Sequence, residues 1–161
     1  MTDFERLLEA LVKGGVQFVV VGGIAGRAHG SVRLTEDLDI VYARDLDNLV
    51  RTATALAPFH PYPRGAPPGL PFRWDAETLK RGLNFTLVTD LGWVDLLGEI
   101  AGGGDYSDLV GQSIVVSLFG LECKCLELKP LIKAKRAAGR PKDFDALAEL
   151  EALLEERETQ G

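Results

Sequence analysis

Residues 16–40 constrain the fold more than any other part of the chain. An apolar, β-branched run, VQFVVVGG, ends in Gly22 and Gly23, which is typical of a buried strand that leads into a tight turn. Thirteen residues after the glycines, a second apolar run contains Asp37 and Asp39, with one leucine between them. The chain must therefore place two carboxylates in a strand while it still forms a core.

Residues two apart on a strand point to the same face, so Asp37 and Asp39 would hold their carboxylates within about 7 Å of each other. Leu38 and Ile40 would then face the core. Two carboxylates at this distance repel each other unless a positive charge lies between them, and a divalent cation such as Mg²⁺ or Mn²⁺ is the usual solution. The alternative is that both acids lie on the solvent-facing side of a half-exposed strand.

Two features near this pair suggest a binding site for a phosphate group. Because glycine has no side chain, the backbone at Gly22 and Gly23 can come close to phosphate oxygens. A short helix is expected at residues 24–29, and its positive N-terminal end would also face the phosphate. The segment between glycines and acids supplies Arg33 and Thr35, a cation and a hydroxyl that can hold phosphate oxygens. Together they favour a site for a nucleotide and a metal ion.

Two residues further along the chain extend this hypothesis. Asp95 lies between apolar residues in VDLLG, and an interior carboxylate needs a partner. It would be either a third metal ligand or a buried acid paired with an arginine. Lys135, in a basic helical segment, would either contact phosphate or lie on a solvated face.

The remaining pattern alternates helices and strands. A helix is expected at residues 4–12 and another at 44–57, and residues 84–90 and 92–100 should form a hairpin of two strands. A Pro-rich loop is expected at 58–75, too rich in proline for helix or strand, and a second loop at 101–110. A strand should follow at 112–120 and a strand or turn at 121–128, and the 127–157 segment should form two helices broken at 139–141.

Composition limits the ligands and the location. The 161 residues carry a net charge of −6, so no global basic field exists to hold nucleic acid, and a small phosphorylated ligand fits better. A hydrophobic content of 46% suits one globular domain spanning residues 1–161. The acidic, amphipathic start lacks the features of a signal peptide, and no run of eighteen apolar residues occurs. We therefore expect a cytoplasmic protein with no membrane partner.

The strand, the glycine pair and Asp-x-Asp together resemble the DNA polymerase β-type nucleotidyltransferases. The segments HGSVRLTEDLDI and KAKRAAGRPKDFDAL, the second near the C-terminus, are similar to segments of a narrower group. This group is the small bacterial nucleotidyltransferases related to the toxins of abortive-infection toxin–antitoxin systems. This chain has Gly23 where many members have serine, so only the backbone can contact the triphosphate there. The resemblance implies an α/β (α+β) nucleotidyltransferase fold, with a mixed β-sheet flanked by helices; the two helices expected at 127–157 would form its C-terminal helical pair.

The resemblance also implies an activity. It is two-metal transfer of a nucleoside monophosphate from a nucleoside triphosphate to a hydroxyl acceptor, which is a protein, an RNA or a small molecule. Asp37, Asp39 and Asp95 would be the catalytic metal ligands, with Gly22, Gly23, Arg33, Thr35 and Lys135 binding the nucleotide. The chain could then be the toxin of a pair with an antitoxin partner. The alternative is a nucleotide-binding or partner-binding module of the same fold without catalysis; a metal-dependent phosphohydrolase fits less well, because no His-rich cluster accompanies the acids.

Overall fold

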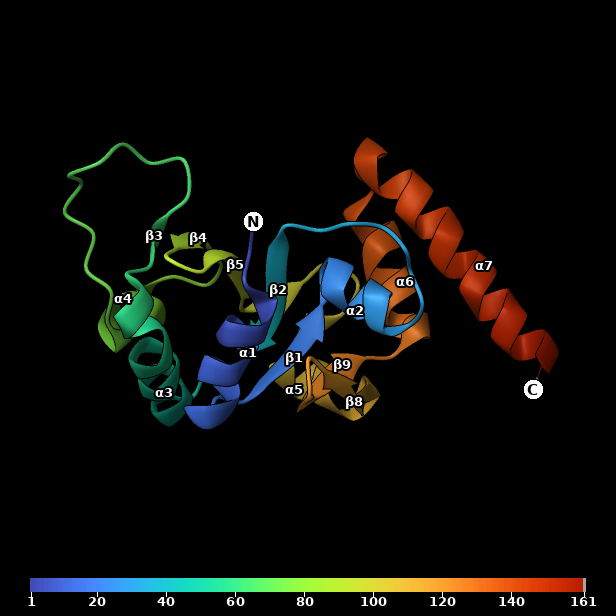
Figure 1. Ribbon diagram of the computed structural model, residues 1–161, viewed down its shortest axis with the longest axis horizontal. Helices are drawn as coiled ribbons and strands as arrows, with labels where there is room; N and C mark the ends of the chain where they lie inside the picture. Colours follow the sequence, from blue (N-terminus) through green and yellow to red (C-terminus); the bar gives the residue numbers. More distant parts are fainter. Residues whose placement is uncertain (161) are drawn as a thin grey trace.

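A mixed sheet forms the centre of the computed structural model, which describes residues 1–160 apart from the side chain of Lys142 (Figure 1). Helices flank this sheet, so the predicted mixed α/β architecture is confirmed at that level. In order across the sheet, the strands are β3 (Tyr62–Pro63), β4 (Phe85–Thr89), β5 (Gly92–Leu97), β2 (Asp37–Tyr42), β1 (Phe18–Val21), β9 (Leu121–Leu126) and β8 (Ser113–Leu118). A separate two-stranded ribbon joins β6 (Glu99–Ile100) and β7 (Gly104–Asp105).

The helices, apart from α5 (Tyr106–Leu109), form two groups along the sheet. Their bounds are α1 (Phe4–Lys13), α2 (Gly22–Ala28), α3 (Leu46–Leu56), α4 (Ala76–Arg81), α5 (Tyr106–Leu109), α6 (Leu128–Ala138) and α7 (Phe144–Gln160), with 3₁₀ turns η1 (Ala57–Phe59), η2 (Val110–Gln112) and η3 (Pro141–Asp143). One group consists of α1, α3 and α4, and the other of α2, α6 and α7 (Figure 1). The predicted C-terminal helical pair is therefore present as α6 and α7, separated by η3.

Strand pairing determines which residues meet at the centre of the sheet. The pairs β1–β2 and β4–β5 are antiparallel, and the predicted hairpin of β4 and β5 is confirmed. In contrast, β2 and β5 are parallel neighbours although α3, η1, β3, α4 and β4 separate them in sequence. The acids of β2 and β5 therefore lie on adjacent strands.

Four predictions about local structure were wrong. The strand expected at 92–100 is interrupted at Gly98, so that β5 and β6 belong to different sheets. Tyr62 and Pro63 form a short strand inside the Pro-rich segment, because an edge strand tolerates a residue without an N–H on its unpaired side. The segment 101–110 is not a loop throughout: it contains β7 and α5, and Asp105 and Asp108 form a capping box at the start of α5. Helix α2 begins at Gly22, earlier than predicted.

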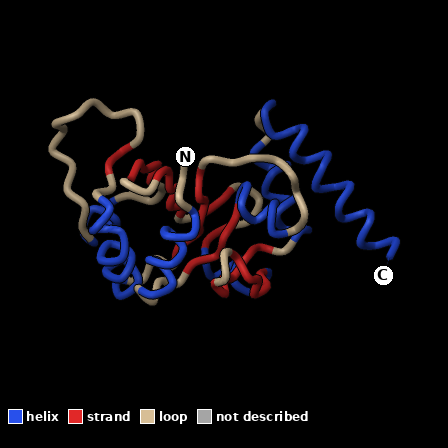
Figure 2. Tube along the Cα trace, viewed as in Figure 1, coloured by secondary structure: helices blue, strands red, loops and turns tan. Residues whose placement is uncertain are grey.

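Long stretches of the chain still lie outside helices and strands (Figure 2). One of them follows β3 and extends away from the sheet before it reaches α4, and another connects α2 to β2. In residues 1–160, no helix is both long enough and apolar enough to cross a lipid bilayer.

Candidate acidic site in a central cavity

Three aspartates converge on one face of the sheet. Leu38 and Ile40 are fully buried, as predicted, which leaves Asp37 and Asp39 on the opposite face of β2. The parallel register of β2 and β5 sets Asp39 directly opposite Asp95. One carboxylate oxygen from each of the three residues lies within 4.8 Å of the others. Strand β5 thus places Asp95 close enough to Asp37 and Asp39 for all three carboxylates to contact one ion.

The carboxyl group of Asp39 is in an unfavourable position for a negative charge. Burial, together with the neighbouring carboxylates of Asp95 and Asp37, raises its pKa to about 8. Its Oδ1 atom is buried and has no hydrogen-bond partner among the described residues. A buried acceptor without a donor is costly, and a cation with oxygen ligands would supply what it lacks. The donor set therefore fits a divalent cation.

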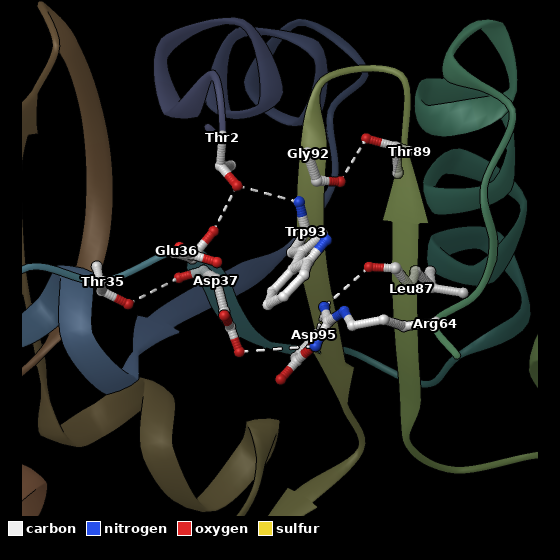
Figure 3. A network of polar contacts seen from close by, with 10 residues as sticks. All are labelled: Thr2, Thr35, Glu36, Asp37, Arg64, Leu87, Thr89, Gly92, Trp93 and Asp95. Carbon is white, nitrogen blue, oxygen red and sulfur yellow. Dashed lines mark hydrogen bonds and ion pairs between the residues drawn. The ribbon is translucent and has the colours of Figure 1, made fainter. Parts of the chain in front are cut away.

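An arginine pairs with two of these three aspartates, as shown in Figure 3. Arg64 follows β3, and its Nη2 donates to Asp95 Oδ1 at 2.8 Å, while its Nη1 lies 3.7 Å from Asp37 Oδ2. The alternative reading of Asp95, as an acid paired with an arginine, therefore describes a real contact. It coexists with the convergence of the three aspartates. Sequence analysis missed Arg64, because it lies in the Pro-rich segment, where no periodicity indicates a face.

Thr2 links the beginnings of β2 and β5, the two strands that carry the aspartates. Its Oγ1 donates to the carbonyl of Glu36, immediately before β2, and accepts a hydrogen bond from the backbone N–H of Trp93 in β5 at 3.1 Å (Figure 3). One side chain thus links the two strands near the acids. This link fixes the ends of the strands that hold the carboxylates.

The acids form part of the wall of a cavity of about 530 Å³. A volume of this size lies in the range typical of small-molecule sites. All eight residues selected from the sequence line it: Gly22, Gly23, Arg33, Thr35, Asp37, Asp39, Asp95 and Lys135. Acidic residues that the sequence analysis did not select also line it: Glu99, Asp143 and Glu149. The structure thus brings the selected residues together, and their roles stay predictions.

The cationic and hydroxyl residues of this wall differ in how firmly they are held. Lys135 pairs with Asp143 Oδ1 at 3.3 Å, and its side chain is only 21% exposed, so the alternative of a solvated basic face is wrong for this residue. Its charge also reaches the acids, because it lowers the pKa of Asp39 against the larger opposing effects. Arg33 is exposed at the edge, and Thr35 donates weakly to the carbonyl of Asp37 at 3.4 Å.

The two glycines are required by the protein's own side chains. A Cβ atom at Gly22 would lie 2.1 Å from Asp39 Oδ2, and one at Gly23 would lie 2.7 Å from the Thr35 hydroxyl oxygen. Gly22 also has a φ of +65°, which side chains rarely adopt. The sequence signal was therefore correct about close approach, but the nearest groups are Asp39 and Thr35. A side chain at Gly22 would displace a candidate metal ligand.

We expect Gly22→Ala to destabilise the metal-free protein much more than Gly120→Ala. Both glycines have positive φ, at +65° and +79°, but nothing lies within 4 Å of a Cβ at Gly120. Alanine with a positive φ costs about 1–2 kcal/mol of folding free energy in each variant. Only Gly22→Ala adds a clash with Asp39. Urea denaturation in EDTA measures both losses. Equal losses would mean that the Asp39 carboxylate moves aside freely and is not fixed by β2.

Comparisons with known proteins add no family. No protein-family model matches this chain, and a search of curated proteins found no significant relative.

Proposed function

We propose that this chain is a metal-dependent nucleotidyltransferase. It would move a nucleoside monophosphate from a nucleoside triphosphate to a hydroxyl group of an acceptor. The observation that supports this most is the convergence of Asp37, Asp39 and Asp95 in a cavity that also presents cationic side chains. Three acids suit a metal ion, and Arg33 and Lys135 suit the phosphates that such an ion would accompany.

The residues of the cavity have separate tasks in this proposal. Asp37 and Asp39 would hold Mg²⁺ or Mn²⁺, and the unpartnered Oδ1 of Asp39 is the first candidate ligand atom. When bound, the cation would neutralise phosphate charge and stabilise the leaving group. Arg33 and Lys135 would contact phosphate oxygens. Gly22 and Gly23 would contribute backbone N–H groups, since the space beside them is taken by Asp39 and Thr35.

Asp95 is the candidate general base. Its carboxylate would take the proton of the acceptor hydroxyl as the new bond forms between that oxygen and the α-phosphorus. The bond from the α-phosphorus to the β-phosphate oxygen breaks, and pyrophosphate leaves with the electron pair. The resemblance of the sequence motifs extends the proposal to a protein, RNA or small-molecule acceptor and to an antitoxin partner, and the acidic, amphipathic start of the sequence extends it to a cytoplasmic enzyme.

A second candidate function rests on Arg64. Because this arginine already pairs with Asp95, the acids are partly neutralised without a metal ion. That contact favours a nucleotide-binding or partner-binding module without catalysis. The two candidates differ in whether the α-phosphate is transferred, which a labelling experiment measures directly.

We expect thermal stability to depend on metal and nucleotide together. Mg²⁺ or Mn²⁺ with a triphosphate should raise Tm more than either alone, because phosphate oxygens complete the shell of a cation held by Asp37 and Asp39. Ligand at a hundred times its Kd stabilises by about 2.7 kcal/mol. Melting curves with ATP, GTP, CTP and UTP, each with and without EDTA, test this. Equal stabilisation in EDTA would contradict a metal-bridged site.

The position of the transferred label tests catalysis. The protein is incubated with Mg²⁺ and each triphosphate labelled on the α- or the γ-phosphate, with total RNA, a protein extract or a polyol as acceptor. Nucleotidyl transfer moves α-label to an acceptor and releases γ-label as pyrophosphate. Release of γ-label as inorganic phosphate would indicate a hydrolase. Binding without transfer of either label would support the non-catalytic module.

A further inference from the structure

Arg64 is anchored on three sides at the acidic cluster. Its Nη2 donates both to Asp95 Oδ1 at 2.8 Å and to the carbonyl of Leu87 at 2.9 Å, and its Nη1 faces Asp37 Oδ2 (Figure 3). Its guanidinium carbon lies 4.5 Å from the centroid of the Trp93 ring, within the range of a cation–π contact. The side chain is only 18% exposed.

The backbone also holds Arg64 in place. Its N–H donates to the carbonyl of Thr86 at 2.9 Å, directly after the pairing of β3 with β4. Thr86 in turn lies opposite Asp95 in the β4–β5 ladder. The arginine is therefore attached to the same strands that position Asp95, and its placement follows from the sheet.

We infer that Arg64 supplies the second positive centre of the acidic site, so that the site takes one divalent cation with its nucleotide instead of two. This inference rests on the proposed function. The single cation would be held on the side of Asp37 and Asp39, where the buried Oδ1 of Asp39 has no partner. Arg64 remains bound to Asp95 and supplies the positive charge on that side of the site.

Coulomb repulsion is the physical reason that a second ion is excluded. A metal ion about 2.1 Å from Asp95 Oδ1 would lie at most about 5 Å from the guanidinium nitrogen bound to the same oxygen. Like charges at this distance in a partly buried site repel by several kcal/mol. An ion bound to Asp95 Oδ1 therefore competes with Arg64, and an arginine displaced from Asp95 would also lose its contacts with the Leu87 carbonyl and the Trp93 ring.

Charge balance favours the same arrangement. Among the protein's own groups at the cluster, three ionised carboxylates are balanced by one guanidinium and one divalent cation, which leaves the charge of the triphosphate to Arg33 and Lys135 in the same cavity. Without Arg64, the same carboxylates retain a negative charge after the first ion binds. Removing the guanidinium therefore opens a place for a second ion.

Counting bound Mn²⁺ by electron paramagnetic resonance tests the inference without an activity assay. The sample is the full chain with a saturating α,β-methylene analogue of the triphosphate that gives the largest Tm shift. We expect one Mn²⁺ per protein in the parent and two in Arg64→Met, which keeps an apolar side chain against Trp93 but removes the charge. Arg64→Lys retains a cation and should stay at one.

Arg81→Met is the matched control, because Arg81 is 78% exposed on α4 and its loss changes the net charge equally. It should bind one Mn²⁺. Two ions in the parent, or one ion in both the parent and Arg64→Met, would overturn the inference and leave the proposed function intact. If neither parent nor variant binds Mn²⁺ with the nucleotide, the proposed function fails, and the role of Arg64 fails with it.

Discussion

Asp39→Asn is expected to stabilise the metal-free protein at alkaline pH and to abolish its metal-dependent binding of nucleoside triphosphate. The pKa of Asp39 is raised from 3.8 to about 8 by burial and by the carboxylates of Asp95 and Asp37. Between these two values the folded protein binds a proton that the unfolded chain does not. The contribution of Asp39 to stability is therefore complete below pH 4 and is lost as the pH rises through about 8.

Asparagine resembles the protonated acid, so the variant should not lose stability across this window. We expect the parent to lose on the order of a few kcal/mol relative to Asp39→Asn between pH 5 and pH 9. Urea denaturation in EDTA at pH 5, 7 and 9 measures the difference. The same substitution removes a charged metal ligand, so Mn²⁺ and triphosphate should no longer raise Tm.

The exposed Asp47, near the start of α3, provides the control. Asp47→Asn removes one negative charge far from the cavity and should follow the parent across the pH range. Parallel pH profiles for the parent and Asp39→Asn would show that Asp39 ionises normally and is not crowded by its neighbours.

The aspartates could be found from the sequence because successive side chains of a strand point to opposite faces of the sheet. Two acids that alternate with Leu38 and Ile40 must share one side of a strand, and Asp95 between apolar neighbours gave the same signal on another strand. The pairing of β2 with β5 could not be read from this pattern, because it depends on the path of the intervening chain. The structure shows it, with Asp39 of β2 opposite Asp95 of β5.

The partners of these residues could not be predicted, for reasons that differ between them. Arg64 reaches Asp95 only because β3 pairs with β4 at the edge of the sheet, and a Pro-rich segment gives no sign of such pairing. Gly22 did signal a close approach, but a sequence does not say which atom approaches. Lys135 has a buried partner, Asp143, in the turn after its own helix; spacing alone could not distinguish this pair from a solvated face.

Asp95→Asn is expected to separate binding from chemistry. Asparagine has nearly the same shape, and its side-chain oxygen can still accept the hydrogen bond from Arg64 Nη2 that Asp95 Oδ1 accepts at 2.8 Å. Asp37 and Asp39 remain to hold the cation, so the Tm shift with Mn²⁺ and triphosphate should stay largely intact. Transfer of α-label should fall by a hundredfold or more, on the order of what the loss of a general base costs.

Asp90→Asn is a suitable control for this loss, because Asp90 lies in the turn of the same hairpin and pairs with His60 at the surface. It should transfer label at the parent rate. If Asp95→Asn also transfers at that rate, Asp95 takes no proton, and its carboxylate serves only to hold Arg64. If it loses nucleotide binding as well, Asp95 contributes to the cation site itself, because an amide still accepts from Arg64 but is a much weaker ligand for a divalent ion. Only retained binding with lost transfer agrees with a base at Asp95 beside a single cation at Asp37 and Asp39.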